Sequence, residues 1–444
     1  MPYVSKRGRR PDEYASKSSH VHVIRDPSVQ EFLANCILPK QADQVDLDEH
    51  CAILFQPVTP NPIHHIIAID GGYTEVPVRI EFPSATICFF QIGALIFSVA
   101  DLDTLDETPF IDPEDISKLR QIQRLKFTLP VRNITLNGET SFRKSVRQAI
   151  HTFFRQSLDD MLLIDTLKWF VFEEYAAQLD EWMLATCPLC DSTHIPLKRA
   201  AMTRDYSFVC PKCRGEILLT DVFRLHEAID EELGAGGVLG YVITTVEQMV
   251  LVHLIRLILR TKPSLLQHIL FIKDGPLAFF GQTANMHKPM RQLVNFLFDH
   301  YDLNLAGLEK TGPFVEHADE ISSRLKEGSI LILDNDYIYK YVVPGKADPS
   351  NPYGRTTYYG NKVIFKTPTQ RMHVITLPTR QILTHPQEGD FYNLQVILTN
   401  VEKLKCDMYD DALIPVAMVN KLVSLANHPS ARILQKFAIS SIQR

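Results

Sequence analysis

The chain has 444 residues, of which 45% are hydrophobic and 22% charged, and its formal net charge at pH 7 is -6. These proportions are typical of a folded globular protein and exclude a disordered or fibrous chain. The negative net charge excludes nucleic-acid binding by the whole surface, so any such binding must be local. The length fits one large domain with a small module, or two to three ordinary domains.

The N-terminal segment predicts neither a targeting signal nor a membrane anchor. Residues 1–20 are basic and polar, and no apolar run follows the charges as it does in a secretory signal. The longest weakly polar stretch, residues 86–100, is too short to span a bilayer. We therefore expect a cytoplasmic protein. Residues 1–62 should form a tail with a short helix over 28–37, and little function can be predicted there.

The first strand of a sheet is expected over residues 64–70, an apolar run that stops at Gly71 and Gly72. Asp70 would then lie at the carboxyl end of a buried strand, where it is either a turn residue or a ligand in a site. Residues 86–99 are rich in Ile and Phe and should supply a further strand.

The charges that follow are segregated along the chain. Residues 101–115 contain seven acidic and no basic residues, which predicts a solvated loop. Residues 118–147 contain eight basic residues and one acid, which suits a patch that follows phosphates and equally suits ordinary solvated faces. Apolar residues at helical spacing then predict one or two long helices within residues 141–182.

Two CxxC pairs form the most specific motif, with nineteen residues between Cys187-Pro-Leu-Cys190 and Cys210-Pro-Lys-Cys213. Two such knuckles place four thiolates around one tetrahedral site, the arrangement that Zn²⁺ prefers. Because four thiolates leave no position open for water or substrate, the predicted zinc is structural, and the ribbon around it needs the metal to fold. The remaining cysteines are expected in the core: Cys36, Cys51, Cys88 and Cys406.

An amphipathic helix is expected over residues 244–260, and it carries Glu247 on its apolar side, because apolar residues follow at i+3, i+4 and i+7. A buried carboxylate needs a partner, and a divalent cation would serve. The alternative is a helix start. Thr245 and Gln248 have the spacing of a capping box, which would make Glu247 a first-turn acid that favours the helix dipole.

The next strand, residues 269–274, ends at Asp274, much as the first strand ends at Asp70. An Asp on an early strand, a Glu on a following helix and an Asp at the end of the next strand reproduce the carboxylate order of RNase H-like nucleases. Oxygen ligands of this kind suit Mg²⁺ or Mn²⁺ and leave positions open for water and phosphate. Asp70, Glu247 and Asp274 are therefore predicted to bind two catalytic ions for phosphodiester hydrolysis.

The C-terminal part should add strands to the sheet and close with a helix that begins near Pro415. A second basic region, residues 337–387, has seven basic residues, one acid and six tyrosines. Basic groups beside aromatic rings suit a nucleic-acid strand whose bases stack, although solvated faces of strands have the same composition. The strands are expected over residues 329–333, 337–343, 363–366 and 373–376.

Three motifs resemble the NurA family of DNA-repair nucleases: IAIDGGY from Ile67, TTVEQ from Thr244 and IKDGPLAFFGQ from Ile272. The segments GPFVEHAD from Gly312 and YGRTTYYGNK from Tyr353 extend the resemblance toward the C-terminus. The resemblance implies an RNase H-like fold, Mn²⁺- or Mg²⁺-dependent cleavage of DNA, a homodimer, and partnership with a HerA-type hexameric ATPase.

By position in these motifs, Asp70, Glu247 and Asp274 would be the metal ligands, and Lys310 would contact phosphate as a cation. The chain contains no GxxxxGK[ST] segment, so it would depend on an outside motor to move along DNA.

One position departs from the family. The C-terminal helix of NurA proteins often carries a histidine near the site, and Asn420 stands at the matching place here. His287 and His317 are either substitutes for it or ordinary histidines. The departure supports an alternative function, a non-catalytic adaptor that binds DNA or a motor. A third possibility is an RNase H-like enzyme that acts on RNA, because recognition of the 2′-hydroxyl leaves no short motif.

The expected architecture is an RNase H-like mixed α/β sheet flanked by helices. Its nuclease domain would comprise residues 63–182 and 223–444, and a four-cysteine zinc ribbon would be inserted at residues 183–222.

Overall fold

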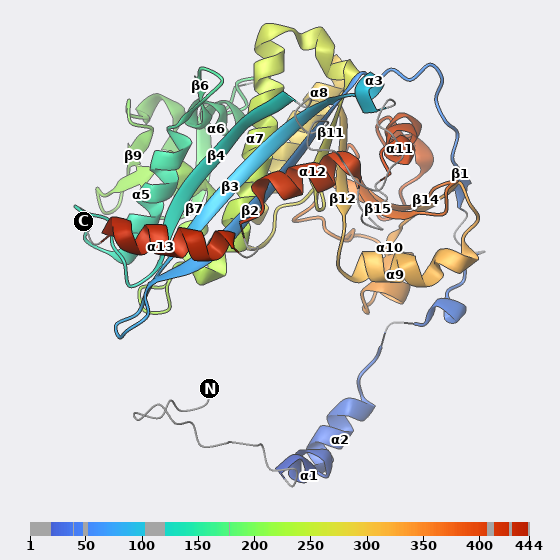
Figure 1. Ribbon diagram of the computed structural model, residues 1–444, viewed down its shortest axis with the longest axis horizontal. Helices are drawn as coiled ribbons and strands as arrows, with labels where there is room; N and C mark the ends of the chain where they lie inside the picture. The colour runs from blue at the N-terminus through green and yellow to red at the C-terminus, as the bar shows by residue number, and fades with distance from the viewer. Residues whose placement is uncertain are drawn as a thin grey trace.

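The computed structural model describes residues 19–38, 40–47, 52–102, 120–176, 178–405, 413–425 and 429–442. A nine-stranded sheet forms its centre (Figure 1). The strands are β1 (Ile53–Leu54), β2 (His65–Arg79), β3 (Ala85–Ser98), β4 (Arg120–Arg132), β11 (Ile269–Asp274), β12 (Asn304–Glu309), β13 (Ser329–Ile332), β14 (Gly360–Lys366) and β15 (Met372–Pro378). They lie in the order β1-β13-β14-β15-β12-β11-β2-β3-β4.

The sheet is mixed. β11 pairs in parallel with both β2 and β12, and the other neighbouring strands pair antiparallel. A parallel pair needs a crossover connection. The chain between β2 and β11 provides this connection, and the long helix α7 (Leu239–Thr261) lies near its end. The predicted fold class, a mixed α/β sheet flanked by helices, is confirmed.

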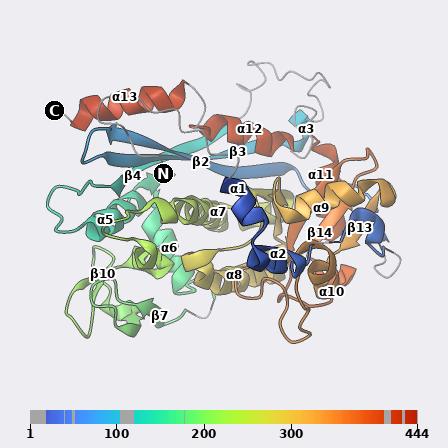
Figure 2. The ribbon, with the colours of Figure 1, turned by 90° about the horizontal axis from the view of Figure 1, so that it is seen from below.

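Helices cover both faces of the sheet (Figure 2). Side chains alternate along β2, so Ile67 and Ile69 join the core on the side of α7, while Ile66 and Ala68 join the core on the side of α12. The α7 side also holds α5 (Phe142–Phe154), α6 (Leu163–Val171) and α8 (His287–Tyr301), and the α12 side holds α11 (Leu394–Lys403), α12 (Ile414–Val423) and α13 (Ser430–Ile442).

The prediction that Gly71 and Gly72 stop the first strand is wrong, because β2 runs through both glycines to Arg79. A Cβ atom added at Gly72 would lie 2.6 Å from the carbonyl oxygen of Val423 at the end of α12. A Cβ atom at Gly71 would meet the side chains of Ile243 and Glu247 from α7. The glycines therefore let helices approach the strand closely from both faces, and they do not turn the chain.

The strand predicted over residues 337–343 is also wrong. The chain instead forms the short helix α10 (Asn335–Tyr337) and a wider helical turn over Ile338–Val342. Asp334 caps the turn by accepting a hydrogen bond from the backbone N–H of Tyr337 (2.7 Å). Tyr337 and Tyr341, four residues apart, are both buried with ring centroids 5.0 Å apart. Tyrosines at every second position imitated a strand, but the buried pair has helical spacing.

A ribbon of two small hairpins lies between α6 and α7. Its strands are β7 (Glu181–Thr186), β8 (Thr193–Lys198), β9 (Ser207–Val209) and β10 (Glu216–Leu218), with β7 paired to β8 and β9 to β10. Each hairpin carries one CxxC pair in or beside its turn.

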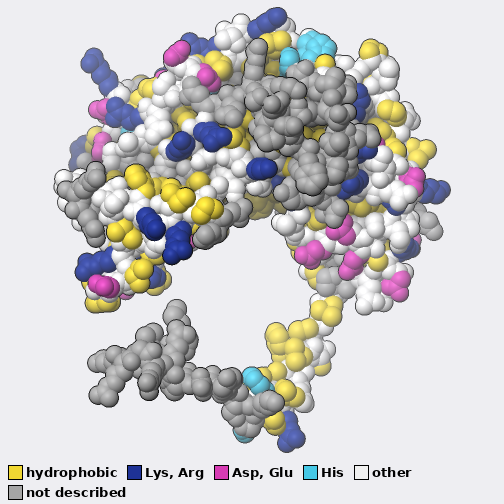
Figure 3. Space-filling model, viewed as in Figure 1, with side chains coloured by type: hydrophobic (Ala, Val, Ile, Leu, Met, Phe, Trp, Pro, Cys, Tyr) yellow, Lys and Arg dark blue, Asp and Glu magenta, His cyan; other side chains and the backbone are white. Residues whose placement is uncertain are grey.

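Residues 19–38 form an arm that stands away from the body (Figure 1, Figure 3). The arm contains α1 (Ser19–Ile24) and α2 (Pro27–Ala34), and α2 has no buried residue. The helix predicted over 28–37 is present as α2, with Asp26 as its N-cap. The predicted acidic loop, residues 101–115, lies outside the described residues apart from its first two.

One helix among the described residues has the length and composition of a membrane span, Gly236–Thr261. It contains α7, and 72% of its most apolar window is buried inside the protein. Such burial is typical of the central helix of a protein core.

Candidate metal centre

The register between β2 and β11 brings two of the predicted carboxylates together. Lys273 of β11 is opposite Ile69 of β2, so Asp274 and Asp70 are the next positions on two neighbouring parallel strands. Because side chains alternate along a strand, both aspartates lie on the α12 side of the sheet. Asp70 is 5% exposed, and Asp274 is at the point where β11 ends.

Glu247 reaches the same place from the other side of the sheet. It lies well inside α7, which begins at Leu239, so the prediction that Glu247 is a first-turn acid of a capping box is wrong. A Cβ atom at Gly71 would lie 2.9 Å from Oε1 of Glu247, and the Glu247 side chain is buried. The absence of a side chain at Gly71 is what allows this carboxylate to reach the strand.

Two of the three carboxylates, those of Asp70 and Glu247, lie against the backbone of Gly71. Its N–H donates a hydrogen bond to Oδ1 of Asp70 (2.7 Å), and it also contacts Glu247, whose pKa it lowers. Pairing between β2 and β11 ends at Ile69 and Lys273, and β2 continues past that point. The site therefore lies just beyond the carboxyl end of β11, where one strand ends and its neighbour does not.

Burial and mutual repulsion perturb these acids. Burial raises the pKa of Asp70 to about 8, and the negative charges of Asp274 and Glu247 contribute to the rise while Lys310 opposes it. Burial also raises the pKa of Glu247, against the effect of Lys273. Within the described part of the chain, Oδ2 of Asp70 is buried and has no hydrogen-bond partner. An unpaired buried carboxylate oxygen is costly, so these residues fit a bound cation.

Two lysines lie among the carboxylates. Nζ of Lys310 is 2.8 Å from Oδ2 of Asp274, and Nζ of Lys273 is 3.1 Å from Oε2 of Glu247. Lys273 also donates to the backbone carbonyl of Asp274. Lys310, predicted to contact phosphate, is thus placed at the site as the ion-pair partner of a predicted ligand.

Sequence reasoning missed Lys273. The signal was present, because alternation along β11 directs Asp274 to the α12 side and Lys273 to the α7 side, where Glu247 lies. In this chain the lysine directly before Asp274 is therefore the cation that pairs with the carboxylate on the opposite face.

The carboxylates are spread more widely than the cysteine ligands. The sulfur atoms of the four cysteines all lie within 4.8 Å of one another. Among the described residues, no other group of three or more His, Cys, Asp or Glu side chains has its ligand atoms this close together. Asp70, Glu247 and Asp274 do not meet that spacing, with two of them on one face of the sheet and Glu247 on the other.

The cysteines fit a tetrahedral zinc site. Sγ of Cys187 is 3.9 Å from Sγ of Cys213, and Sγ of Cys190 is 4.0 Å from Sγ of Cys210. Four sulfurs at about 2.3 Å from a central Zn²⁺ would be about 3.8 Å apart, close to these distances. A backbone N–H donates to the second thiol of the loop in the form typical of such knuckles, from Gly215 to Cys213 (3.4 Å).

The other cysteines only partly follow the prediction that they lie in the core. Cys88 is buried in β3, whereas Cys36 is exposed on the arm. Cys51 and Cys406 lie outside the described residues.

The candidate histidines occupy other environments. Nε2 of His317 lies 2.7 Å from the hydroxyl of Tyr337 in a buried cluster, and Nδ1 of His287 lies 2.6 Å from the carbonyl oxygen of Ala284. Asn420 is exposed on α12, the helix that covers the face of Asp70.

The first predicted basic patch is only partly a surface feature. Arg124, Lys126 and Arg132 are exposed along β4. Arg147 is not part of a patch, because it is buried and forms a two-bonded ion pair with Asp221. The composition of the segment could not show that Arg147 is buried in an ion pair with Asp221.

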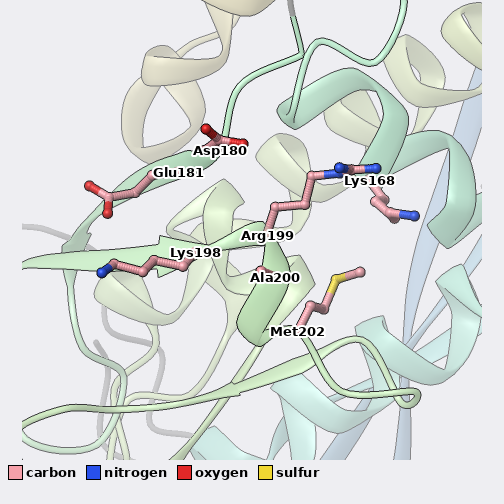
Figure 4. A pocket seen from close by; sticks show the side chains of 7 residues that line it. All are labelled: Lys168, Asp180, Glu181, Lys198, Arg199, Ala200 and Met202. Carbon is pink, nitrogen blue, oxygen red and sulfur yellow. The ribbon is translucent and has the colours of Figure 1, made fainter.

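A cavity of about 460 Å³ lies beside the ribbon and away from the carboxylates (Figure 4). Lys168 and Arg199 line it, and both are ion-paired with Glu174, at 3.4 and 3.0 Å. The lining holds three cations (Lys168, Lys198 and Arg199) and two acids (Asp180 and Glu181), and Glu174 is the third acid, so the charges balance and we assign no chemistry to this cavity. Its complete lining is Lys168, Asp180, Glu181, Lys198, Arg199, Ala200 and Met202.

Comparison with known proteins gives one solved structure to report. No protein-family model matches the chain, and no curated protein does. The crystal structure of the NurA nuclease from Sulfolobus solfataricus aligns with 96% of this chain and 97% of its own, with a TM-score of 0.36 and 9% sequence identity. At this TM-score and identity the match assigns no activity, so function has to be argued from the carboxylates.

Proposed function

We propose that this chain is a metal-dependent deoxyribonuclease in which Asp70, Glu247 and Asp274 bind Mn²⁺ or Mg²⁺. The main support is the buried Oδ2 of Asp70, which has no partner among the described residues and lies beside two further carboxylates. Carboxylate oxygens suit these ions and leave positions for water and phosphate. Bound in a pair, such ions activate the attacking water and stabilise the leaving oxygen of a phosphodiester.

The protein groups have separate roles in this proposal. Asp70 must release its proton to act as a ligand, and its raised pKa makes that release dependent on cation binding. Lys273 holds Glu247 in place through their ion pair. Lys310, which is 22% exposed, can leave Asp274 and contact a phosphate oxygen of the substrate. The zinc of the ribbon, held by Cys187, Cys190, Cys210 and Cys213, is structural.

A cleavage assay with end-labelled DNA and Mn²⁺ tests the proposal. Asp70→Asn, Glu247→Gln and Asp274→Asn should each reduce cleavage by about a hundredfold or more, since each removes a ligand oxygen charge. Glu320→Gln, an exposed acid on α9 (Pro313–Ile321), is the matched control and should cleave normally. Folding is checked by circular dichroism. If the three site variants cleave like the control, the proposal is wrong.

Partners and assembly enter the proposal through the sequence resemblance. A HerA-type hexameric ATPase would move the DNA, since the chain has no P-loop of its own, and the nuclease would act as a homodimer in the cytoplasm. Co-purification with such an ATPase and light scattering of the purified chain test these points. Parallel assays on DNA and RNA decide the substrate class.

A non-catalytic adaptor is the second candidate. The wide spacing of the carboxylates, the lysines paired with Asp274 and Glu247, and the exposed Asn420 favour it. It predicts DNA binding with no release of nucleotides under Mn²⁺ and no change on substitution of Asp70.

A further inference from the structure

Four aromatic side chains form a continuous row beyond the end of β11, and we call them the aromatic row: Phe280, Tyr358, Tyr353 and Tyr339. The ring centroids of consecutive members are 5.7, 5.8 and 6.0 Å apart. Phe280 is 38% exposed, Tyr353 and Tyr339 are half-buried, and Tyr358 is buried. Phe280 is therefore open to solvent, Tyr339 at the other end is partly so, and the buried Tyr358 supports the row from within.

The row is held rigidly by its backbone. Gly354 has a φ of 73°, and a Cβ atom there would lie 2.3 Å from the ring of Tyr358. A Cβ atom at Gly345 would lie 2.8 Å from the ring of Tyr339. The buried side chain of Asn335 accepts a hydrogen bond from the backbone N–H of Tyr353 (2.8 Å). Rings fixed in this way lose little freedom when a ligand stacks on them.

The aromatic row is connected to the candidate metal centre. Ala278 and Tyr358 form a β-bridge, so the segment that follows Asp274 is fastened to the loop that carries the row. Nζ of Lys362 lies 4.7 Å from the ring centroid of Tyr358 and forms a buried ion pair with Glu309, which directly precedes Lys310. The row is therefore joined both to the segment that follows Asp274 and to the strand end that carries Lys310.

Cations accompany the row. Arg355 and Lys346 are exposed in the loop between Val342 and β14. A guanidinium nitrogen of Arg291 donates to the carbonyl of Tyr358 (2.7 Å), and its Nε has no partner among the described residues. The loop carries one acid, Asp348, which accepts hydrogen bonds from Ser350 and interacts with the charge of Arg355. Lys346 and Arg355 outnumber this acid, so the loop keeps a net positive charge that suits phosphates.

We propose that the aromatic row binds the single-stranded end of the DNA substrate and leads it to the carboxylates. Bases stack on Phe280 and Tyr339, and phosphates contact Arg355 and Lys346. Every base offers an aromatic face, so such a platform accepts any sequence, but it requires unpaired bases. This inference rests on the proposed nuclease function, and it names the form of DNA that reaches the site.

The test is DNA binding without cleavage. Fluorescence anisotropy with labelled oligothymidylate and with a blunt duplex is measured without added Mn²⁺ or Mg²⁺ and without a chelator, so that DNA is not cleaved and the ribbon keeps its zinc. Phe280→Ala and Tyr339→Ala should each weaken binding of the single strand by roughly tenfold, the loss typical of one stacked base. Binding of the duplex should stay unchanged. Phe437→Ala removes a more exposed aromatic ring on α13 (58% against 38% for Phe280) and is the control.

Conservative variants separate stacking from folding. Phe280→Tyr and Tyr339→Phe keep a ring and should restore the single-strand affinity. Equal losses for single strand and duplex, or wild-type affinity in both alanine variants, would overturn the inference. A change of oligomeric state in light scattering with unchanged DNA affinity would also overturn it, because the row would then be an interface between copies.

Failure of the nuclease proposal gives a different result. If the chain never cleaves DNA but binds single strands through Phe280 and Tyr339, the inference about the aromatic row stands and the nuclease proposal is wrong. If a variant without both rings still cleaves DNA and binds single strands as tightly as the wild type, the nuclease proposal stands and the inference about the aromatic row is wrong.

Discussion

Replacement of Arg147 should destabilise the protein strongly, because its charge is buried against Asp221. The side chains are 6% and 3% exposed, and the guanidinium makes two hydrogen bonds to the carboxylate, at 2.8 and 2.6 Å. A further guanidinium bond reaches the carbonyl of Glu216 in β10 (3.1 Å). The pair therefore joins α5 to the end of the ribbon.

The size of the loss in unfolding free energy depends on the Asp221 carboxylate that remains after Arg147 is replaced. In Arg147→Met the side-chain volume is nearly kept, but the Asp221 carboxylate stays buried beside the backbone N–H of Leu218 (2.8 Å) and the imidazole of His226, whose Nδ1 is 3.9 Å away and whose pKa burial lowers. Breaking a buried pair in this way costs about 3–5 kcal/mol of unfolding free energy. The double variant Arg147→Met/Asp221→Leu leaves no buried charge and should recover a large part of that loss.

Urea unfolding followed by circular dichroism measures the effect, and release of zinc to a chromogenic chelator shows whether the ribbon loosens first. The exposed pair of Arg380 and Asp299 gives the control, since Arg380→Met should cost less than about 1 kcal/mol. A loss below about 1 kcal/mol for Arg147→Met, or a double variant as unstable as the sum of the single ones, would refute this account of the pair.

Three other outcomes are expected. Removal of zinc by a chelator, or Cys210→Ser, should make the ribbon sensitive to protease, and metal analysis should give one zinc per wild-type chain and none in the variant. In metal-free protein, Asp70 keeps its proton when folded up to a pKa of about 8 but releases it near its ordinary value of 3.8 when unfolded, so stability should fall as pH rises between these values. Asp70→Asn should remove this slope in thermal unfolding, and an unchanged slope would show that Asp70 is not the group. Gly72→Ala should destabilise by about 2 kcal/mol or more, because its Cβ would lie 2.6 Å from a backbone oxygen, whereas Gly236→Ala, with nothing within 4 Å, should be neutral.

Local patterns predicted the elements whose cause is local. The strand expected over residues 269–274 has those bounds in β11, because an apolar run of that length between a polar turn and a glycine has few alternatives. The cysteine cluster was equally predictable from the sequence, since the spacing within each knuckle determines its geometry.

The sequence could not show how helices approach β2. Gly71 and Gly72 look like a turn until it is known that α7 and α12 pack on opposite faces of the same strand. For the same reason the sequence could not show that Glu247 reaches the site from the face opposite to Asp70. The close helix approach at the glycines and the position of Glu247 both depend on contacts between residues far apart in the chain. A local sequence pattern cannot predict such contacts.

Tyrosine spacing misled in a different way. Alternation at Tyr337, Tyr339 and Tyr341 has the period of a strand, but the pair that is buried is spaced by four. Burial, which the sequence does not give, decides between the two periods.

The pairing of β2 with β11 joins residues from opposite ends of a long stretch of chain, with the whole ribbon between them. During synthesis the hairpins of the ribbon can form as soon as they emerge from the ribosome, because their contacts are local, while Asp70 must wait for Asp274. The four cysteines can therefore meet before Asp70 and Asp274 do. The candidate metal centre is completed only after residue 274 of 444 has been made, so the two metal sites of one chain form in a fixed order.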